Sequence, residues 1–244
     1  MRHRVLLSVF LIVTFNLCAL AEQWPTNNVL FRVLYIKVGD FTGSAFTIER
    51  GDKQYLITAR HLLEGLPRND ASIQINLQGK WETLNGNVIL PEERDVDIAV
   101  FTLPRELTPK FEIELGKIVT IGEGGYFFGY PHGWHSEVDR QYVAFVKRAS
   151  VSAVPKTKNG AHYFYLNGFN NPGFSGGPVA FYDYKSNQWA IVAVISGFEP
   201  EAAKKLVGQS YVDADEMLVN SGVIVAFPIQ PALDALDKYI AEKR

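Results

Sequence analysis

Residues 171–179, "NPGFSGGPV", place one serine within a short run of glycines. Ser175 lies at the centre, with Gly173 two positions before it and two glycines directly after it. Glycines in a tight loop adopt backbone angles that can aim several N–H groups at one point. The stretch is therefore either a turn without chemistry or the loop of a nucleophilic serine, and the rest of the chain has to decide between them.

A serine hydroxyl needs a base within hydrogen-bond reach before it becomes a nucleophile at neutral pH. The chain has five histidines, all of them before Ser175: His3, His61, His132, His135 and His162. The pattern G-x-S-x-G also occurs in the nucleophile elbow of α/β-hydrolases, where the histidine follows the serine, so that interpretation cannot be completed here. The subtilisin order of acid, histidine and serine would need an acid before His61, and the surroundings typical of that family are missing. The order histidine, acid, serine can be completed well.

Two upstream stretches supply the histidine and the acid. "YLITARHLLEG", residues 55–65, predicts a buried strand followed by a tight turn that projects His61 into a cleft. "DVDIAVFTL", residues 95–103, contains two carboxylates. Asp97 directly precedes an aliphatic residue and alanine and is the preferred candidate, while Asp95 is interpreted as a solvated residue at the start of the strand.

These three motifs resemble those of chymotrypsin-fold (trypsin-like) serine peptidases. The family pattern T-A-A-H has Arg60 in place of the second alanine here, and G-D-S-G-G-P has Phe174 in place of aspartate. "FFGYPHG" and "NSGVIVAFPI" are similar to further segments of bacterial members. The resemblance covers roughly Asn28 to Ile240 and is closest in style to the protease domain of HtrA/Deg proteins, without their PDZ domains.

The fold implied is all-β, with two six-stranded antiparallel β-barrels (a trypsin-like double barrel) and a C-terminal helix. Many short strands separated by turn signals agree with this picture. We expect residues 22–244 to form the peptidase domain: an N-terminal barrel at about 28–103, a link at about 104–116, a C-terminal barrel at about 117–229 and the helix at about 231–242. Glu199 to Glu216 is polar and is expected to be a long loop, in which "PEAAKKL" could form a helical turn.

By this resemblance the protein is a serine endopeptidase that works through an acyl-enzyme. Ser175 would be the nucleophile, His61 the general base and acid, and Asp97 the carboxylate that orients the imidazole. The N–H groups of Gly173 and Ser175 would form the oxyanion hole. Protein or peptide substrates are implied, and no metal or organic cofactor is.

The substrate pocket expected by resemblance combines residues before the serine loop with residues of a later strand: Phe169, Ser196, Gly197 and Phe198. No acid occupies the expected floor of this pocket. We therefore expect apolar or small residues at the P1 position of the substrate rather than arginine or lysine.

Two departures from the family pattern leave questions open. Phe174 cannot make the ion pair with a new N-terminus by which zymogen-type members shape the oxyanion loop, so the loop must be held by packing or ordered by substrate. Arg60 could lower the pKa of His61 by charge repulsion or point into solvent. His132 and His135 lie three residues apart without a third nearby ligand, which favours a polar loop over a metal site.

Other functions remain as alternatives. A catalytically silent trypsin-like module that binds proteins or peptides is the main one, although such modules commonly lose a triad residue and all three positions are filled here. An esterase or acyl-transfer role on the same residues is a narrower alternative. The net charge of −2 and the absence of a Lys/Arg cluster argue against nucleic-acid binding.

Residues 1–21 have the pattern of a signal peptide: a basic start, an apolar stretch and an Ala19-Leu20-Ala21 cleavage site before Glu22. An uncleaved membrane anchor is the alternative, but the apolar stretch is short for a full span. Cleavage removes two arginines, which takes the net charge from −2 to −4, and it removes Cys18, the single cysteine. We expect an exported protein, periplasmic or secreted, without a cysteine nucleophile, a cysteine-ligated zinc or a stable membrane anchor.

Overall fold

The computed structural model describes residues 23–138, 140–207 and 210–243, so the predicted signal peptide lies outside the described residues. The helical segments are α1 (Asn27–Leu30), η1 (Arg60–Leu63), η2 (Pro131–Gly133) and α2 (Gln230–Glu242). The strands of the first half are β1 (Val33–Val38), β2 (Phe41–Arg50), β3 (Lys53–Thr58), β4 (Ala71–Leu77), β5 (Lys80–Gly86), β6 (Val88–Ile89) and β7 (Ala99–Thr102). Those that follow are β8 (Glu114–Leu115), β9 (Gly124–Gly129), β10 (Ser136–Val138), β11 (Gln141–Val143), β12 (Phe145–Ala153), β13 (Phe164–Asn167), β14 (Pro178–Asp183), β15 (Gln188–Val207) and β16 (Ser210–Pro228).

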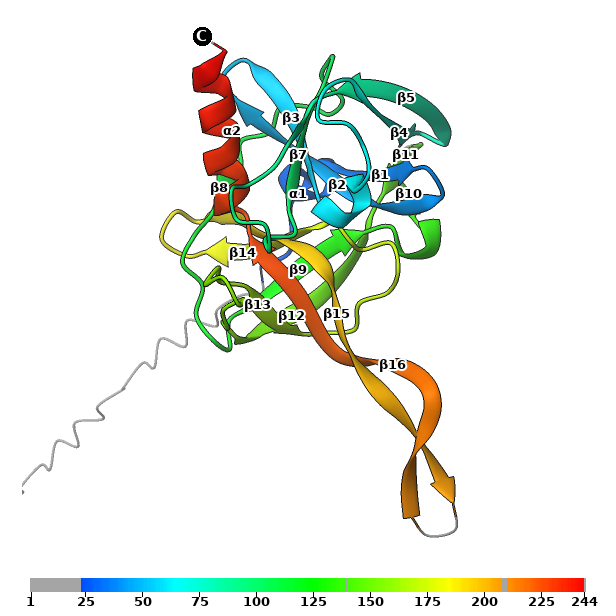
Figure 1. Cartoon of the computed structure of the whole chain (residues 1–244). Helices are drawn as coiled ribbons and strands as arrows, with labels where there is room; N and C mark the ends of the chain where they lie inside the picture. Colours follow the sequence, from blue (N-terminus) through cyan, green and yellow to red (C-terminus); the bar gives the residue numbers. More distant parts are fainter. Residues whose placement is uncertain (1–22, 139, 208–209, 244) are drawn as a thin grey trace, which may run out of the picture.

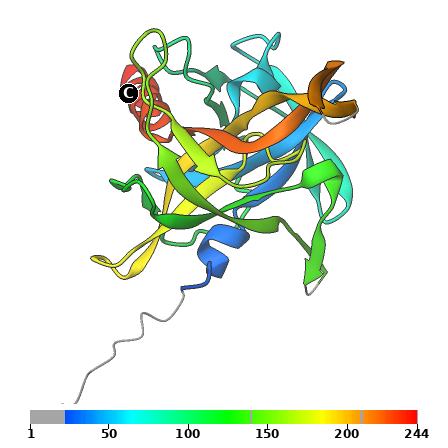
Figure 2. The ribbon, with the colours of Figure 1, turned by 90° about the horizontal axis from the view of Figure 1, so that it is seen from below.

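The second half of the chain forms a closed barrel. Its strands pair in the order β14-β9-β12-β13-β16-β15, and a further pairing of β14 with β15 closes the ring with six strands. The short β8 adds to β15 in parallel, outside the ring. Figure 2 looks at this barrel from below, with its green, yellow and orange strands facing the viewer. A closed ring leaves no unpaired edge among its own strands.

The first half forms a curled sheet in the order β5-β4-β1-β2-β3-β7-β6. Among the described pairings its two ends, β5 and β6, do not meet, so this sheet is a half-barrel rather than a closed ring. Along β4 the apolar Ala71, Ile73 and Ile75 are buried and alternate with polar residues that are more exposed, as expected for a strand with one buried face. The predicted trypsin-like double-barrel class is confirmed, with closure complete only in the second half.

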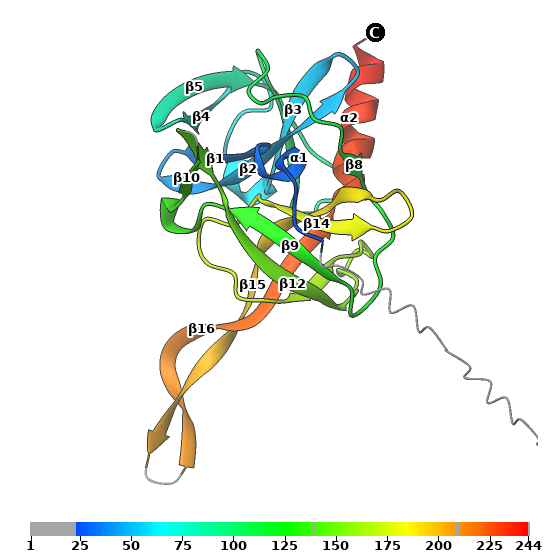
Figure 3. The ribbon, with the colours of Figure 1, turned by 180° about the vertical axis from the view of Figure 1, so that it is seen from behind.

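The two sheets share a core with the C-terminal helix. Ile48 of the first sheet, Val194 of the second and Leu233 of α2 belong to one buried apolar cluster. Pro231 lies in the first turn of α2, where its missing N–H costs no helical hydrogen bond. The helix stands beside the first sheet (Figure 3) and confirms the predicted C-terminal helix. Within the described residues no helix is long and apolar enough to cross a membrane.

The prediction of a long loop from Glu199 to Glu216 is wrong. Strands β15 and β16 continue through this segment as a two-stranded ribbon that projects from the barrel (Figure 1). Antiparallel pairs such as Glu201 with Val219 satisfy the backbone hydrogen bonds along the ribbon. A ribbon outside the barrel exposes both faces to water, so its polar composition resembles that of a loop. Leu218 on this ribbon is 67% exposed.

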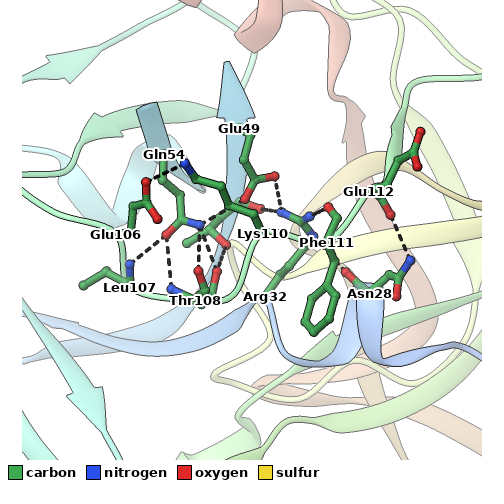
Figure 4. A network of polar contacts seen from close by, with 11 residues as sticks. Asn28, Arg32, Glu49, Gln54, Glu106, Leu107, Thr108, Lys110, Phe111 and Glu112 are labelled. Atoms are coloured by element: carbon green, nitrogen blue, oxygen red, sulfur yellow. Dashed lines mark hydrogen bonds and ion pairs between the residues drawn. The ribbon is translucent and has the colours of Figure 1, made fainter. Parts of the chain in front are cut away.

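A buried arginine joins the connection between the two halves to the first sheet (Figure 4). The side chain of Arg32 is fully buried and makes an ion pair of 2.6 Å with Glu49. Arg32 also donates to the carbonyl oxygen of Phe111, and Gln54 accepts the amide of Leu107 at 2.8 Å. The predicted link therefore lies against the first sheet through specific polar contacts, which fixes how the chain enters the second barrel.

Candidate active site

His61 is presented by a buried strand and a short helical turn, as the sequence predicts. Leu56 and Ile57 of β3 are fully buried, and the chain then turns through η1. Leu62 and Leu63 anchor this turn in the core. The imidazole of His61, which lies between the buried strand and these two leucines, stays 43% exposed. Burial of its chain neighbours thus fixes the backbone of His61 while its ring reaches the surface.

Asp97 lies two residues before the start of β7, and its carboxylate contacts His61. One carboxylate oxygen accepts the backbone N–H of His61 at 2.8 Å, and the other lies 2.7 Å from the Nδ1 atom of its ring. The second oxygen also accepts the hydroxyl of Ser196 at 2.5 Å. Asp95 takes no part in this cluster: its carboxylate accepts the N–H of Asn159 at 3.3 Å. It therefore has a partner in a distant loop, which its interpretation as a solvated residue did not include.

The pKa of His61 is raised above its usual value of 6.5. The hydrogen bond to Asp97 is the largest cause, the negative charges of Asp97 and Glu64 add to it, and partial burial opposes it. Arg60 does not contribute to this shift of the His61 pKa. Its guanidinium donates to the carbonyl of Arg94 at 3.0 Å. When Nδ1 donates to the carboxylate, the neutral ring has Nε2 free to accept a proton.

Ser175 is connected to this pair through Ser196. The hydroxyl of Ser175 donates to the carbonyl oxygen of Ser196 at 2.9 Å, and the hydroxyl of Ser196 donates to Asp97. Ser196 therefore contacts both sides of the site, Ser175 through its backbone carbonyl and the Asp97–His61 pair through its hydroxyl. Among the described residues no direct hydrogen bond joins Ser175 to His61. Ser196 was predicted only as a pocket residue, and its contact with Asp97 was not.

The backbone around Ser175 has a fixed orientation. The carbonyl of Pro172 accepts the N–H of His132 at 2.9 Å, and that of Phe174 accepts the N–H of Gly177 at 2.8 Å. In a trans peptide the N–H points away from the preceding carbonyl. The N–H groups of Gly173 and Ser175 therefore point to the opposite side, and neither donates a hydrogen bond within the part of the chain that the structure describes.

Gly173 has to be glycine for two reasons. Its φ of +106° lies in a region that side chains rarely adopt. A Cβ atom at this position would also lie 2.2 Å from the carbonyl oxygen of Tyr130, well inside contact distance. Any larger residue would therefore displace the loop from the turn at η2 against which it packs.

Phe174 is fully buried in the second barrel. Its ring packs edge-to-face against Phe127 at 4.9 Å between centroids, and the ammonium group of Lys147 lies 5.3 Å from its centre. Of the two alternatives left open by the sequence, packing is the one that the structure contains. An apolar side chain in the core occupies the place where the family pattern has an ion-pairing aspartate.

The residues predicted to line the substrate pocket lie on two segments, one before the Ser175 loop and one on β15. The side chain of Asn170 connects them. Phe169 is 55% exposed, while Gly197 and Phe198 belong to β15. Asn170 is buried, and its amide nitrogen donates to the carbonyl oxygen of Gly197 at 2.9 Å. Sequence reasoning did not identify Asn170, because nothing in "GFNNPG" shows which of its residues turns inward.

The surroundings of the site are polar on the histidine side. A cavity of about 380 Å³ opens beside His61, and its lining includes residues of both charges: Arg60, Arg68, Arg94, Glu64, Asp95 and Asp97. Within the described residues no group of three potential ligands could hold a metal ion. His135, which belongs to the predicted polar loop, stacks on Tyr142 with 3.6 Å between ring centroids.

Comparisons with known proteins agree with this geometry. The family model of the trypsin-like peptidase domain matches residues 43–191. The HtrA-type protease AlgW, solved with a tripeptide, has a similar fold: the TM-score is 0.60 at 18% identity, covering 89% of this chain and 62% of AlgW. The protease Rv3671c from M. tuberculosis H37Rv, in its inactive form, gives a TM-score of 0.53 at 15% identity, covering 86% of this chain and 89% of Rv3671c.

The chain thus spans less than two thirds of the AlgW structure, and at these identities the solved structures establish the fold alone. No curated protein matches the sequence significantly. The family match extends over more than half of the 244 residues and includes His61, Asp97 and Ser175. The chain therefore belongs to the family of trypsin-like peptidase domains.

Proposed function

We propose that the protein is a serine endopeptidase that cleaves peptide bonds with Ser175 as nucleophile. The observation that carries the proposal is the way Ser196 holds the three residues together: its backbone carbonyl accepts the Ser175 hydroxyl, and its own hydroxyl donates to Asp97, which binds His61. It joins the three residue types that acyl transfer by a serine requires, in the order of the family motifs.

The first half of the reaction forms an ester. Ser175 turns from the Ser196 carbonyl toward His61, whose Nε2 atom takes the hydroxyl proton as the Oγ–C bond to the substrate carbonyl forms. The N–H groups of Gly173 and Ser175 donate to the oxyanion of the tetrahedral intermediate. The C–N bond then breaks, and the leaving amine takes the proton from His61.

The second half restores the enzyme. A water molecule loses a proton to His61 and attacks the ester carbon, and the Oγ–C bond breaks as Ser175 recovers a proton from the imidazolium. Asp97 stays ionised throughout, holds Nδ1 as a donor and stabilises the imidazolium. These steps need no metal or organic cofactor, because the developing charge is stabilised by the backbone N–H groups and by Asp97.

A fluorophosphonate probe tests the proposal on the folded protein. We expect covalent labelling that Ser175→Ala abolishes and His61→Ala slows by several orders of magnitude, together with hydrolysis of an unstructured protein such as casein. Ser186→Ala is the matched control, since this exposed serine hydrogen-bonds Glu114 far from the site and should not affect labelling. Absence of labelling between about pH 6 and 9, a range that brackets an ordinary histidine, would favour a silent binding module.

We also propose that the P1 pocket prefers apolar or small residues. The buried Asn170, whose neutral amide binds the carbonyl oxygen of Gly197, places no negative charge between the two segments, which supports this preference. Cleavage-site profiling on a peptide library should show alanine, valine or similar residues before the cut. A majority of arginine or lysine at P1 would refute this preference.

Export to the periplasm or the exterior is proposed from the sequence of residues 1–21 alone. Expression of the full chain in a bacterium, followed by fractionation and determination of the N-terminal residue, should give a product that begins at Glu22 outside the cytoplasm. A product that keeps Met1 and stays with the membrane would support the uncleaved anchor.

A further inference from the structure

Ser44 on β2 contacts the Ser175 loop across the boundary between the two halves of the molecule. Its side chain is fully buried. The hydroxyl donates to the carbonyl oxygen of Gly173 at 2.7 Å and accepts the N–H of Tyr130 at 2.9 Å. The backbone N–H of Ser44 donates to the carbonyl oxygen of Ser175 at 2.8 Å. One residue of the first sheet thus holds two successive parts of the loop.

These contacts complete a pattern along the loop. The four consecutive carbonyl groups from Pro172 to Ser175 each accept one hydrogen bond. The first and third are held by the N–H groups of His132 and Gly177, within the second barrel. The second and fourth are held by Ser44 alone. Because each peptide unit is planar, fixing a carbonyl also fixes the direction of the N–H group in the same unit.

The hydroxyl of Ser44 acts at the centre of this pattern. The carbonyl of Gly173 lies between the two peptide units whose N–H groups face the site. If it loses its partner, rotation about the bonds flanking that unit changes the angle between the N–H groups of Gly173 and Ser175. Two donors must converge on one oxygen to stabilise it, so such a rotation weakens both hydrogen bonds at once.

Resting on the proposed peptidase activity, we propose that the Ser44 hydroxyl is a positioning group that keeps the oxyanion-binding N–H groups of Gly173 and Ser175 convergent. It acts on the chemical step through the loop and does not touch the substrate. Besides His61 and Asp97, the first half of the molecule therefore contributes a third group to the reaction. Ser44 sets the geometry of the oxyanion hole in the second barrel.

The test compares Ser44→Ala with Thr47→Val in the intact protein. Thr47 is also fully buried on β2, and its hydroxyl bonds Thr108 at 2.5 Å, away from the loop. Both variants lose a buried hydroxyl and should lose comparable thermal stability. Ser44→Ala should lower the maximal rate of labelling by a fluorophosphonate about 10- to 100-fold with little change in the probe's half-saturating concentration. Thr47→Val should label at the wild-type rate.

Each outcome decides the proposal. Labelling of folded Ser44→Ala at the wild-type rate, or an equal slowing in Thr47→Val, overturns it while the peptidase function stands. Wild-type protein that does not react with the probe overturns both. If Ser44→Ala does not fold, Ser44→Cys replaces the hydroxyl by a weak donor of similar shape. A folded cysteine variant that labels about tenfold more slowly supports the role, and one with an unchanged rate removes it.

Discussion

The His61 side and the Ser175 side of the site are held by different kinds of contact. Around His61 the contacts are made by side chains: the Asp97 carboxylate binds the ring, and Ser196 binds the carboxylate. Around Ser175 they are made mainly by the backbone, whose carbonyls are fixed one after another, and by the buried ring of Phe174. The side-chain contacts set the protonation and orientation of His61, whereas the backbone contacts set the conformation of the Ser175 loop. Changes on the two sides should therefore have different consequences.

Asp97→Asn should have the largest effect, because it changes the group that determines which nitrogen of His61 carries the proton. An amide can donate to Nδ1 and thus favour the wrong tautomer of His61. We expect the rate constant for the chemical step to fall by about 10³- to 10⁴-fold with little loss of stability. Steady-state kinetics beside thermal unfolding measures both. A fall of less than tenfold would mean that Asp97 does not orient the base.

Phe174→Ala should affect shape and stability together. Removing a fully buried aromatic ring costs about 3–5 kcal/mol of unfolding free energy. Phe181→Ala is the control, because Phe181 is equally buried in the same apolar cluster. Both variants should lose stability in denaturant titrations, but only Phe174→Ala should lose activity under conditions where both remain folded. Equal activities would show that Phe174 does not hold the loop.

Ser196→Ala sharpens the comparison, because it removes the hydroxyl that bonds Asp97 and keeps the carbonyl that Ser175 contacts. A hydrogen bond to a charged group is worth about 1.5–3 kcal/mol, so we expect the chemical step to slow by about 10- to 100-fold. Ser221→Ala, which removes a hydroxyl bonded to the backbone of Glu199, should leave the rate unchanged. A similar loss in both variants would assign the effect to the neighbouring ribbon instead.

The pH profile should show the smallest change. His61 must be neutral to accept a proton, and its pKa is raised, so activity should rise with pH through a midpoint above 6.5. Asp97→Asn should move the remaining activity's midpoint down. By linkage, the His61–Asp97 pair stabilises the fold fully below about pH 6.5, and this contribution fades as pH rises through the raised pKa. The stability difference between wild type and His61→Ala should shrink accordingly in unfolding experiments at several pH values.

The sequence predicts the fold class well because its signals are local. Short apolar segments between turns and Pro231 before an amphipathic stretch specify strands and the last helix without reference to distant residues. The ribbon of β15 and β16 escapes prediction because its sequence lacks the regular alternation of apolar and polar residues that indicates a strand. Its structure comes from pairing between the two strands, which composition does not reveal.

The candidate site was predictable in part, for a related reason. His61, Asp97 and Ser175 stand in motifs whose neighbours are themselves informative. Ser44 contacts Gly173 across 129 positions of sequence through its hydroxyl. In the sequence Ser44 looks like any other small residue in a predicted strand. Contacts of this kind between a side chain and a distant backbone carry no local pattern, so only the folded chain shows them.

The anchored carbonyls of the Ser175 loop also have a thermodynamic consequence. Ordering a residue's backbone costs about 1–2 kcal/mol of conformational free energy, and in this loop that cost is met when the chain folds. Substrate binding energy is then not consumed in arranging the loop and stays available for the transition state. The loop's order is thereby tied to the cooperative stability of the whole domain, so heat should end catalysis in the same transition that unfolds the protein.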